Sequence, residues 1–419
     1  MSKVRAVKNV SSCQNLLSFR ISDIALAFFI FTTVVFNEGA LPSIISKVIL
    51  FVVTLFGCLR SRRFFCNGFI VAAALFLFLS ILSISWSQVP SESVSRVKTF
   101  LYQFVCYACV SSLVQGDRYS LKVCLYTLVA SSIVSAVWVV AINGVTFVDN
   151  RYADGFISSG QLALTSCISM MLCVFWYTKE KQSRYLALLC IFAFILLLTS
   201  SRRDLLTFLT FCLLFFSLIS DDVRKRMGGF LILALASILV IVLCLKVDFL
   251  YQFVGKRLES FFSFIFTGEG GDASTTGRSR LIDFGLNLFR RSPVIGNGIG
   301  TFESLFSTTH GSWNTSADNN YVELLSDLGV MGFAAYYIPL IMFLFHTAKG
   351  LLQKETEVKF AVAGIVAFCA LDFATVWFFS KCGMLMILLF YLLVQAYEGT
   401  QAVHRDASVL DESLEKTEE

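Results

Sequence analysis

Two adjacent arginines, Arg202 and Arg203, follow a polar turn between two short apolar runs, in residues 199–204 (TSSRRD). Charged side chains beside apolar runs of this kind are costly and are usually paired or functional. Guanidinium groups bind phosphate oxygens in bidentate fashion, so the pair predicts an anion site that holds phosphate. The alternative is an exposed turn whose arginines extend to lipid headgroups. Asp204 can pair with either arginine under both interpretations.

Further arginines stand in two other polar segments. Arg278 and Arg280 belong to GRSRL, residues 277–281, where they are two positions apart. Residues two apart do not share a helix face, so one guanidinium can point into a site while the other is solvated. The alternative is an ordinary charged start of a helix. Arg151 lies in DNRYADG, residues 149–155, which suits either a polar re-entrant turn or a ligand contact.

Three other polar features are less specific. His310 is one of three scattered histidines, which predict no metal site, and a lone histidine is more often an ordinary polar residue than a base. Asp372 lies inside an apolar run, where a carboxylate suggests a proton or ion role. The glycine run GNGIG, residues 296–300, lacks the Lys-Ser/Thr of a phosphate-binding loop, so we interpret it as a turn between helices.

The composition indicates a membrane protein. The chain has 419 residues, of which 56% are hydrophobic and 15% charged, and its mean hydropathy is +0.74. Soluble domains average roughly 45–50% apolar and about 25% charged residues, so both a soluble enzyme and a disordered chain are excluded. The net charge of +5 does not suggest a nucleic-acid partner. Most of the thirteen cysteines fall in apolar runs, where they behave as small hydrophobes, and no disulfide framework is expected.

Long apolar runs fill most of the chain, and they are continuous rather than alternating, which favours helices over a β-barrel. We therefore expect an all-α polytopic membrane protein with about twelve transmembrane helices. The expected spans lie roughly at residues 23–37, 44–59, 68–86, 99–115, 121–143, 160–178, 185–200, 204–220, 228–248, 333–348, 360–379 and 383–397.

The distribution of lysine and arginine indicates the orientation. With the N-terminus inside, twenty of the 34 basic residues fall on the cytoplasmic side and twelve outside, while Lys47 and Lys246 lie within spans. Six of the outer twelve belong to one long loop, where the positive-inside rule barely applies. Both termini are therefore expected to face the cytoplasm. The chain then divides into nine spans, a long outer loop with helices, three more spans and an acidic cytoplasmic tail, over residues 1–248, 249–332, 333–397 and 398–419.

The order of these motifs resembles the bacterial O-antigen ligase/polymerase superfamily. The features in common are the many spans, an arginine after a Thr/Ser pair at a late span, and one long loop before the last spans. Within that loop come an arginine-led helix that ends in Ser-Pro, a Gly-x-Gly-x-Gly turn and the pattern Asn-x-Tyr-x-x-x-Leu-x-x-x-Gly-x-x-Gly. In sequence, the resemblance covers mainly residues 199–206 and 277–332.

The resemblance implies a fold, an activity and a set of partners. It implies a GT-C-like, inverting membrane glycosyltransferase of the bacterial inner membrane that uses neither a metal nor another cofactor. The donor is then a glycan on undecaprenyl pyrophosphate, presented at the periplasmic face, so that the active site and the long outer loop face the periplasm. The implied partners are this lipid-linked glycan, the lipid bilayer, a flippase and a chain-length regulator.

The same resemblance assigns roles to the arginines, which hold the pyrophosphate in such relatives. Arg202 matches the span arginine, and Arg278 matches the loop arginine, with Arg280 as a near rival. Arg151 resembles the start of an earlier outer-loop motif more weakly, and Arg203 adjoins the span arginine as a further substrate-binding candidate. Fixed guanidinium charge suits the place where a pyrophosphate leaves, because it stabilises the developing negative charge.

One position departs from the ligase pattern. Lipid A-core ligases carry a His-Asn pair eleven residues before the first glycine of the closing Gly-x-x-Gly, where this chain has Asp318 and Asn319. An acceptor hydroxyl needs a positioned proton acceptor, and Asp318 is the candidate, with Glu303 or His310 behind it. Asn319 and His310 are further substrate-binding candidates.

Asp-Asn at this place looks more like the Wzy-type polymerases. We therefore favour a surface-polysaccharide polymerase that transfers a growing glycan from undecaprenyl pyrophosphate onto the next lipid-linked repeat unit. The alternative within the superfamily is an O-antigen ligase, which moves the finished glycan onto lipid A-core. A transporter or flippase is a third hypothesis, and it predicts inverted repeats and a membrane-depth ion pair, neither of which is clear in the sequence.

Overall fold

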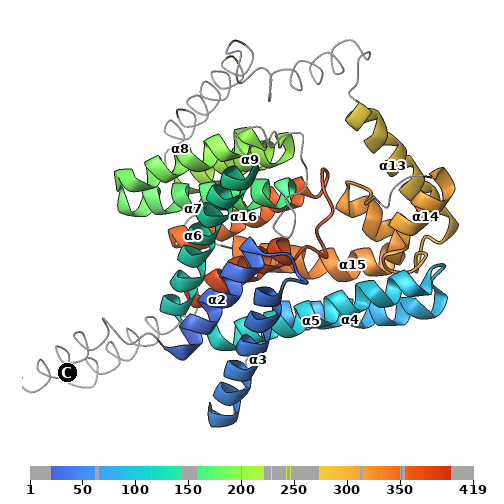
Figure 1. Ribbon diagram of the computed structural model, residues 1–419, viewed down its shortest axis with the longest axis horizontal. Coiled ribbons are helices and arrows are strands. Elements are labelled where there is room, and N and C mark those ends of the chain that lie inside the picture. Colours follow the sequence, from blue (N-terminus) through green and yellow to red (C-terminus); the bar gives the residue numbers. More distant parts are fainter. Residues whose placement is uncertain are drawn as a thin grey trace, which may run out of the picture.

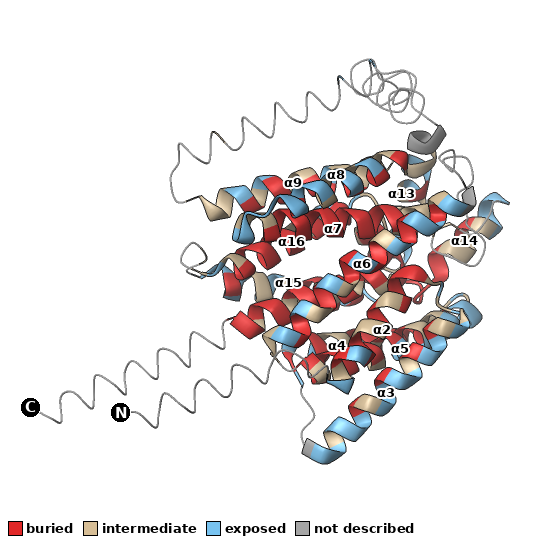
Figure 2. Cartoon of the chain, turned by 60° about the vertical axis from the view of Figure 1, so that its left-hand side comes forward, coloured by how far each residue is buried: buried red, intermediate tan, exposed pale blue. Residues whose placement is uncertain are grey.

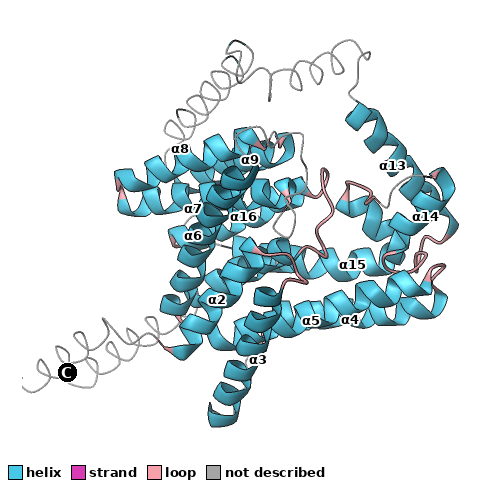
Figure 3. Cartoon of the chain, viewed as in Figure 1, coloured by secondary structure: helices cyan, strands magenta, loops and turns pink. Residues whose placement is uncertain are grey.

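The computed structural model describes residues 20–61, 66–114, 116–143, 158–199, 201–220, 273–311, 315–349 and 354–397, with a few isolated positions besides. The regular elements of these ranges are helices, and no strand occurs among them (Figure 3). The span predicted at 228–248 lies almost wholly outside the described residues, as do the first part of the predicted outer loop and the predicted tail.

The helices follow one another along the chain, and every predicted span within the described ranges contains one (Figure 1). In order they are α2 (Ile21–Val35), α3 (Leu41–Ser61), α4 (Gly68–Ser83), the 3₁₀ helix η2 (Ile84–Trp86), α5 (Pro90–Val114), α6 (Arg118–Asn143), α7 (Ser159–Glu180), α8 (Ser183–Leu198), α9 (Arg202–Ile219), α13 (Ala273–Arg291), α14 (Thr301–His310), α15 (Asn320–Ala348), α16 (Thr356–Leu371) and a final helix, Lys381–Tyr397.

Six helices in the described part of the chain are long and apolar enough to cross a membrane, namely α3, α4 with η2, α5, α6, α7 and α15. The helices α2, α8 and Lys381–Tyr397 are apolar but shorter. Large apolar side chains also cover the outside of the bundle: on α3, Phe56 and Leu59 are 68% and 70% exposed. Apolar surface of this extent needs a lipid environment. The chain is thus a multi-pass helical membrane protein, whereas the number of twelve spans stays a prediction.

α7 is the central helix of the larger bundle. Its residues from Leu162 to Trp176 are all buried, and it packs on α6, α8, α9 and α16. Figure 2 colours most residues of α7 and α16 as buried. Hydroxyl groups on so enclosed a helix need partners, and Ser169 Oγ donates to Thr165 O, one turn earlier, at 2.8 Å. Thr165 Oγ1 likewise donates to Leu162 O at 3.2 Å, whereas the buried Ser166 hydroxyl has no hydrogen-bond partner among the described residues.

A second apolar core joins the helices of the predicted outer loop to the membrane bundle. It lies between α13, α14 and α15 on one side and α4 and α5 on the other. Its members include Phe76, Phe100, Leu288, Phe302, Leu328 and Phe378. This core fixes α13 and α14 against the spans.

The apolar run predicted to span residues 360–379 is interrupted. α16 ends before Asp372, and residues 372–380 form a non-helical connection to the final helix, which we call the 372–380 segment. Asp372 is buried, and its carboxylate accepts hydrogen bonds from Tyr337 Oη at 2.8 Å and from the Trp377 indole N–H. A buried carboxylate is costly without donors, so the chain turns where Asp372 finds them.

A kink at Gly329 divides α15, which joins in one element the end of the predicted outer loop and the span predicted at residues 333–348. Gly329 has φ 61° and ψ −162°, a conformation that favours glycine. The break frees backbone N–H groups, and Val330 N donates to Pro293 O at 2.9 Å. Met331 N donates to Val294 O at 3.1 Å. The N–H groups freed at the kink therefore hydrogen-bond to the first residues of the α13–α14 connection.

The glycine run at residues 296–300 is a turn between α13 and α14, as predicted. Each of its five backbone N–H groups donates to an acceptor of the protein, so the turn keeps none for a phosphate. The acceptors, in order, are Ser292 O, Ser326 O, Asp327 O, Ser83 Oγ and Asp327 Oδ2.

Gly296→Ala should destabilise the protein. Gly296 has φ 68°, and a Cβ there would lie 2.3 Å from Asp327 O, so the turn would have to open. Strain of this kind costs about 1–3 kcal/mol, and we expect a matching loss in the free energy of unfolding. Thermal unfolding in detergent measures it. Gly277→Ala is the control, because its Cβ would meet nothing within 4 Å on α13. Equal unfolding of the two variants would contradict the tight turn.

Candidate functional site

Arg278 and Asp318 form an ion pair across 40 residues of sequence. Arg278 Nε lies 3.2 Å from Asp318 Oδ2. The two side chains remain 41% and 33% exposed, so a ligand can reach both. The pair joins the first turns of α13 to the residue that precedes the cap of α15. The loop arginine and the candidate base, which the sequence could only place on one loop, therefore meet in the structure.

The backbone on both sides of Asp318 is held by hydrogen bonds. Asp318 has φ 50°, in the left-handed region that Asp adopts more readily than most residues. Before it, Ala317 N donates to Glu323 Oε2 at 2.7 Å. After it, Asn319 caps α15, because its Oδ1 accepts from Val322 N at 3.1 Å. These bonds direct the Asp318 side chain away from α15 and toward α13.

Asn319 and Asn320 fix the start of α15 on the 372–380 segment. The Asn319 amide donates to Phe373 O at 3.4 Å, and its side chain is buried. The Asn320 N–H donates to Asp372 O at 2.8 Å. Asn319 thus uses both ends of its amide within the fold and sets the position of Asp318, while its predicted contact with substrate stays a prediction.

The start of α14 is capped by a residue of another helix. Gly300 has no side chain to cap α14, and the carboxylate of Asp327, on α15, accepts from Gly300 N at 2.6 Å and Phe302 N at 3.0 Å. The first N–H groups of a helix need such acceptors. Asp327 therefore fixes α14, the helix that carries Glu303 and His310.

His310 is exposed at the end of α14 and stacks on its own helix. Its ring centroid lies 4.4 Å from that of Phe306, with an interplanar angle of 22°, and 5.5 Å from that of Phe284 on α13. Arg280 is exposed on α13. Arg278 and Arg280 thus have different surroundings, as their spacing predicts.

The two arginines at the start of α9 have neighbours of their own. Arg203 Nε lies 3.4 Å from Oδ2 of the buried Asp204, which also accepts from the Ser201 hydroxyl. The Arg203 guanidinium lies against α7, since a Cβ on Gly160 would be 3.1 Å from its Nη2. Arg202 is half-buried at the first position of the helix. α9 packs on α7 and α16, whereas α13 packs on α14 and α15, so the two groups of arginines rest on different helices.

Arg96, on α5, is a basic residue near the site that the sequence did not single out. Its Nη2 lies 3.2 Å from Glu303 Oε1, and its Cζ lies 3.9 Å from the centroid of the Phe379 ring. The side chain is only 19% exposed. Arg96 therefore ties α5 to α14 and to the 372–380 segment. The only sequence signal was its place among the few basic residues of the outer side.

The structure thus brings Arg278 and Asp318 together, with Asn319 beside them. The arginines of α9 begin a helix that packs on α7 and α16. Arg151 lies outside the described residues. The catalytic and binding roles of all these residues stay predictions.

Comparison with known proteins bears on the same part of the chain. A family model described as O-antigen ligase matches residues 186–337. The match begins in α8 and ends in α15, and it includes both the α9 arginines and the Arg278–Asp318 pair. No curated protein matches the chain. The family match supports the predicted resemblance to the O-antigen ligase/polymerase superfamily, and it does not distinguish ligases from polymerases.

Removing the Arg278–Asp318 pair should leave the fold intact. A solvent-exposed ion pair contributes roughly 0–1 kcal/mol, so Arg278→Gln and Asp318→Asn should each change the free energy of unfolding by less than about 1 kcal/mol. Asp327→Asn is the contrasting variant and should cost about 1–3 kcal/mol, because it disturbs a buried acceptor of backbone N–H groups. Unfolding in detergent measures all three, and a large loss in Arg278→Gln or Asp318→Asn would make the pair structural.

Proposed function

From the match of residues 186–337 to the family model described as O-antigen ligase, we propose that this chain is a surface-polysaccharide polymerase. It transfers a growing glycan from undecaprenyl pyrophosphate onto the next lipid-linked repeat unit, at the periplasmic face of the bacterial inner membrane. The observation that carries the proposal is the ion pair between Arg278 and Asp318. Asp318 stands where the ligase pattern has histidine, and it lies against the arginine that matches the pyrophosphate-binding position.

The transfer needs positive charge at the leaving group and a proton acceptor at the nucleophile. The bond between the anomeric carbon and the pyrophosphate oxygen breaks, and its electron pair goes to that oxygen. Arg278 stabilises the charge that develops there, as a fixed guanidinium can do without a metal ion. Asp318 accepts the proton of the acceptor hydroxyl as its oxygen bonds to the anomeric carbon from the opposite face. Attack from that face inverts the configuration.

The ion pair links binding to proton transfer. While Arg278 Nε contacts Asp318, the guanidinium occupies the carboxylate oxygen that would otherwise meet the acceptor hydroxyl. A pyrophosphate competes with Asp318 for the guanidinium and carries more negative charge. Once it has displaced the carboxylate, Asp318 is free to orient the acceptor hydroxyl.

The other candidate residues extend this site. Arg202 and Arg203 supply further positive charge for the donor at the start of α9. Arg280 and His310 are both exposed, and they suit contacts with the hydrophilic glycan. Arg151 is a third phosphate ligand by its motif alone.

Deleting the gene in its host should leave lipopolysaccharide with the core and a single repeat unit. A polymerase is needed only after the first repeat, so the ligase of the cell can still transfer that unit. Electrophoresis of the lipopolysaccharide shows the ladder directly. Bare core would identify the protein as the ligase instead, and an unchanged ladder would contradict both functions.

Arg278→Ala should fail to restore the ladder in the deletion strain. Loss of one preorganised donor at a developing charge lowers turnover about 100- to 1,000-fold. Arg290→Ala is the matched control on the same helix, where the exposed Arg290 Nη1 donates to a neighbouring side chain in α13, Asn287 Oδ1, at 2.8 Å. Equal amounts of each variant in the membrane fraction exclude an insertion defect. If Arg280→Ala is inactive and Arg278→Ala active, the assignment of the loop arginine is wrong.

A further inference from the structure

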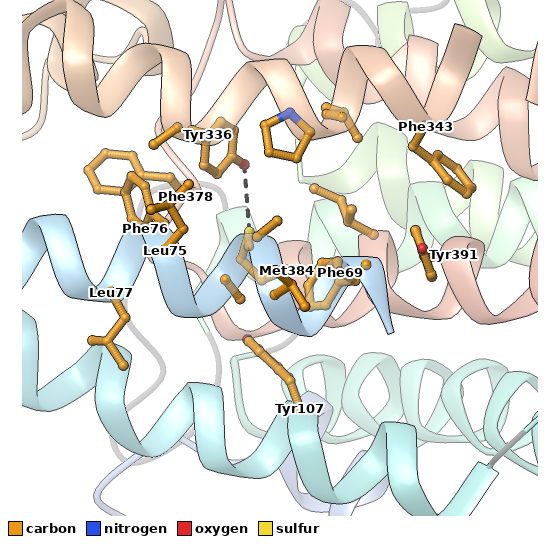
Figure 4. Close-up of a pocket in the computed structure, with 18 of the residues that line it drawn as sticks. Phe69, Leu75, Phe76, Leu77, Tyr107, Tyr336, Phe343, Phe378, Met384 and Tyr391 are labelled. Atoms are coloured by element: carbon orange, nitrogen blue, oxygen red, sulfur yellow. Dashed lines mark hydrogen bonds between the residues drawn. The ribbon is translucent and has the colours of Figure 1, made fainter. Parts of the chain in front are cut away.

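An apolar cavity of about 540 Å³ lies between α4 and α5 on one side and α15 and the final helix on the other. Figure 4 shows aromatic rings from these helices around it. Apart from tyrosines, its polar side chains are Gln103 and His346. The aromatic lining includes Phe69, Phe76, Tyr107, Tyr336, Phe343 and Tyr391.

The cavity opens sideways, toward the bilayer. Three of its lining residues, Val71, Leu75 and Met342, are 60%, 49% and 65% exposed. They belong to α4 and α15, both of which are long and apolar enough to span the membrane. Water is scarce at this depth, and apolar cavities stay dry even in soluble proteins. A hydrocarbon chain is therefore the class of ligand that fits.

The room inside the cavity is part of the fold. Ala72 and Ala335 leave space that larger side chains would fill, and Pro339 interrupts the hydrogen bonds of α15 on its wall. Phe76 packs edge-on against Phe100, with ring centroids 5.6 Å apart, which stiffens one end. Tyr336 Oη contacts Met384 Sδ at 3.5 Å, the dashed line in Figure 4, and links α15 to the final helix.

One end of the cavity is continuous with the support of the candidate site. Phe378 lines the cavity, and its backbone N–H donates to Asn320 Oδ1 at 3.2 Å. Asn320 begins α15, two residues after Asp318, which contacts Arg278. From that end the cavity follows α4 back to Gly68, about 14 Å at 1.5 Å per residue. The cavity is thus a long apolar groove. The wall at its Phe378 end belongs to the 372–380 segment, which supports the start of α15.

We propose that this cavity holds the polyprenyl chain of the lipid-linked glycan whose pyrophosphate Arg278 binds. The proposal rests on the proposed function. Bulk phospholipid could enter from the side, but only the substrate has a chain that continues into a head group at Arg278. A methyl-branched polyprenyl chain also offers contacts to many rings at once. Seating it in a fixed groove sets the position of the pyrophosphate.

The test compares two identical substitutions on α4. Ala72 lines the cavity, whereas Ala74 is exposed and outside the lining. Displacing reacting groups by about 1 Å can lower rates about 100-fold, so Ala72→Phe should lower kcat/KM at least about tenfold with an undecaprenyl-pyrophosphate donor. It should have no effect with a donor on a geranyl chain, which is too short to depend on the groove. Ala74→Phe should match the wild type with both donors.

Equal rates of Ala72→Phe and Ala74→Phe with the long-chain donor overturn the groove assignment. If the wild type transfers glycan from neither donor, the proposed function fails. The ligand of the cavity is then identified by photolabelling alone. In wild-type protein, a diazirine-bearing undecaprenyl phosphate should label cavity residues that are shielded from bulk lipid, such as the buried Phe76 and Phe378. A phosphatidylglycerol with the diazirine on its acyl chain should not. Equal labelling by the two probes assigns the cavity to bulk lipid and overturns the proposal.

Discussion

Around α15, the pairing of buried backbone groups determines how the outer helices sit on the membrane bundle. The carboxylate of Asp327 has no exposed surface, and it accepts the N–H groups of Gly300 and Phe302 that begin α14. Two residues later the kink at Gly329 frees N–H groups, and the α13–α14 connection supplies carbonyls for them. The turn and the kink satisfy each other, so neither is stable alone. The position of α14 follows from this exchange.

Burial separates the carboxylates that support the fold from the one that is available for chemistry. Glu323, Asp327 and Asp372 are almost fully buried, and each accepts hydrogen bonds that hold a loop or a helix start. Removing such an acceptor leaves a buried donor unpaired, which is expensive. Asp318, by contrast, is about one-third exposed and contacts an arginine that is also accessible. An exchange of partners at this pair is cheap in free energy, as the proposed exchange of Asp318 for a pyrophosphate requires.

The sequence predicts elements well where one physical term dominates. The enclosed apolar run of α7 could only be a helix, and the glycine run, without a Lys-Ser/Thr, could be recognised as a turn. The end of α16 was not predictable, because Asp372 accepts a hydrogen bond from Tyr337 on the preceding helix, α15, and the sequence does not show that the two side chains meet.

The same distinction applies to the site. Motif order pointed to Arg278 and to Asp318 separately, but their contact depends on how α13 packs on α15. Arg96 could not be ranked above other outer basic residues without its partner Glu303. Sequence pattern reports local propensity and residue type. It does not report which donor pairs with which acceptor from a distant part of the chain. Both the kink at Gly329 and the Arg278–Asp318 pair depend on such long-range contacts.

A groove for a lipid chain does different work in a bilayer than in water. Lipid tails are as apolar as the groove, so seating a chain there gains little from the hydrophobic effect. Affinity must come from the charged head group, and the contribution of the groove is geometry. Phe378 and Asn320, joined by one backbone hydrogen bond, connect the wall of the cavity to the start of α15 and so to Asp318. The lipid chain would be ordered on the cavity side of that hydrogen bond, and the pyrophosphate would be held on the Asp318 side. The same segment at the start of α15 would therefore fix both. The packing of α4 against α15 then sets the position of the anomeric carbon, although this packing lies far from the charges that stabilise the leaving group.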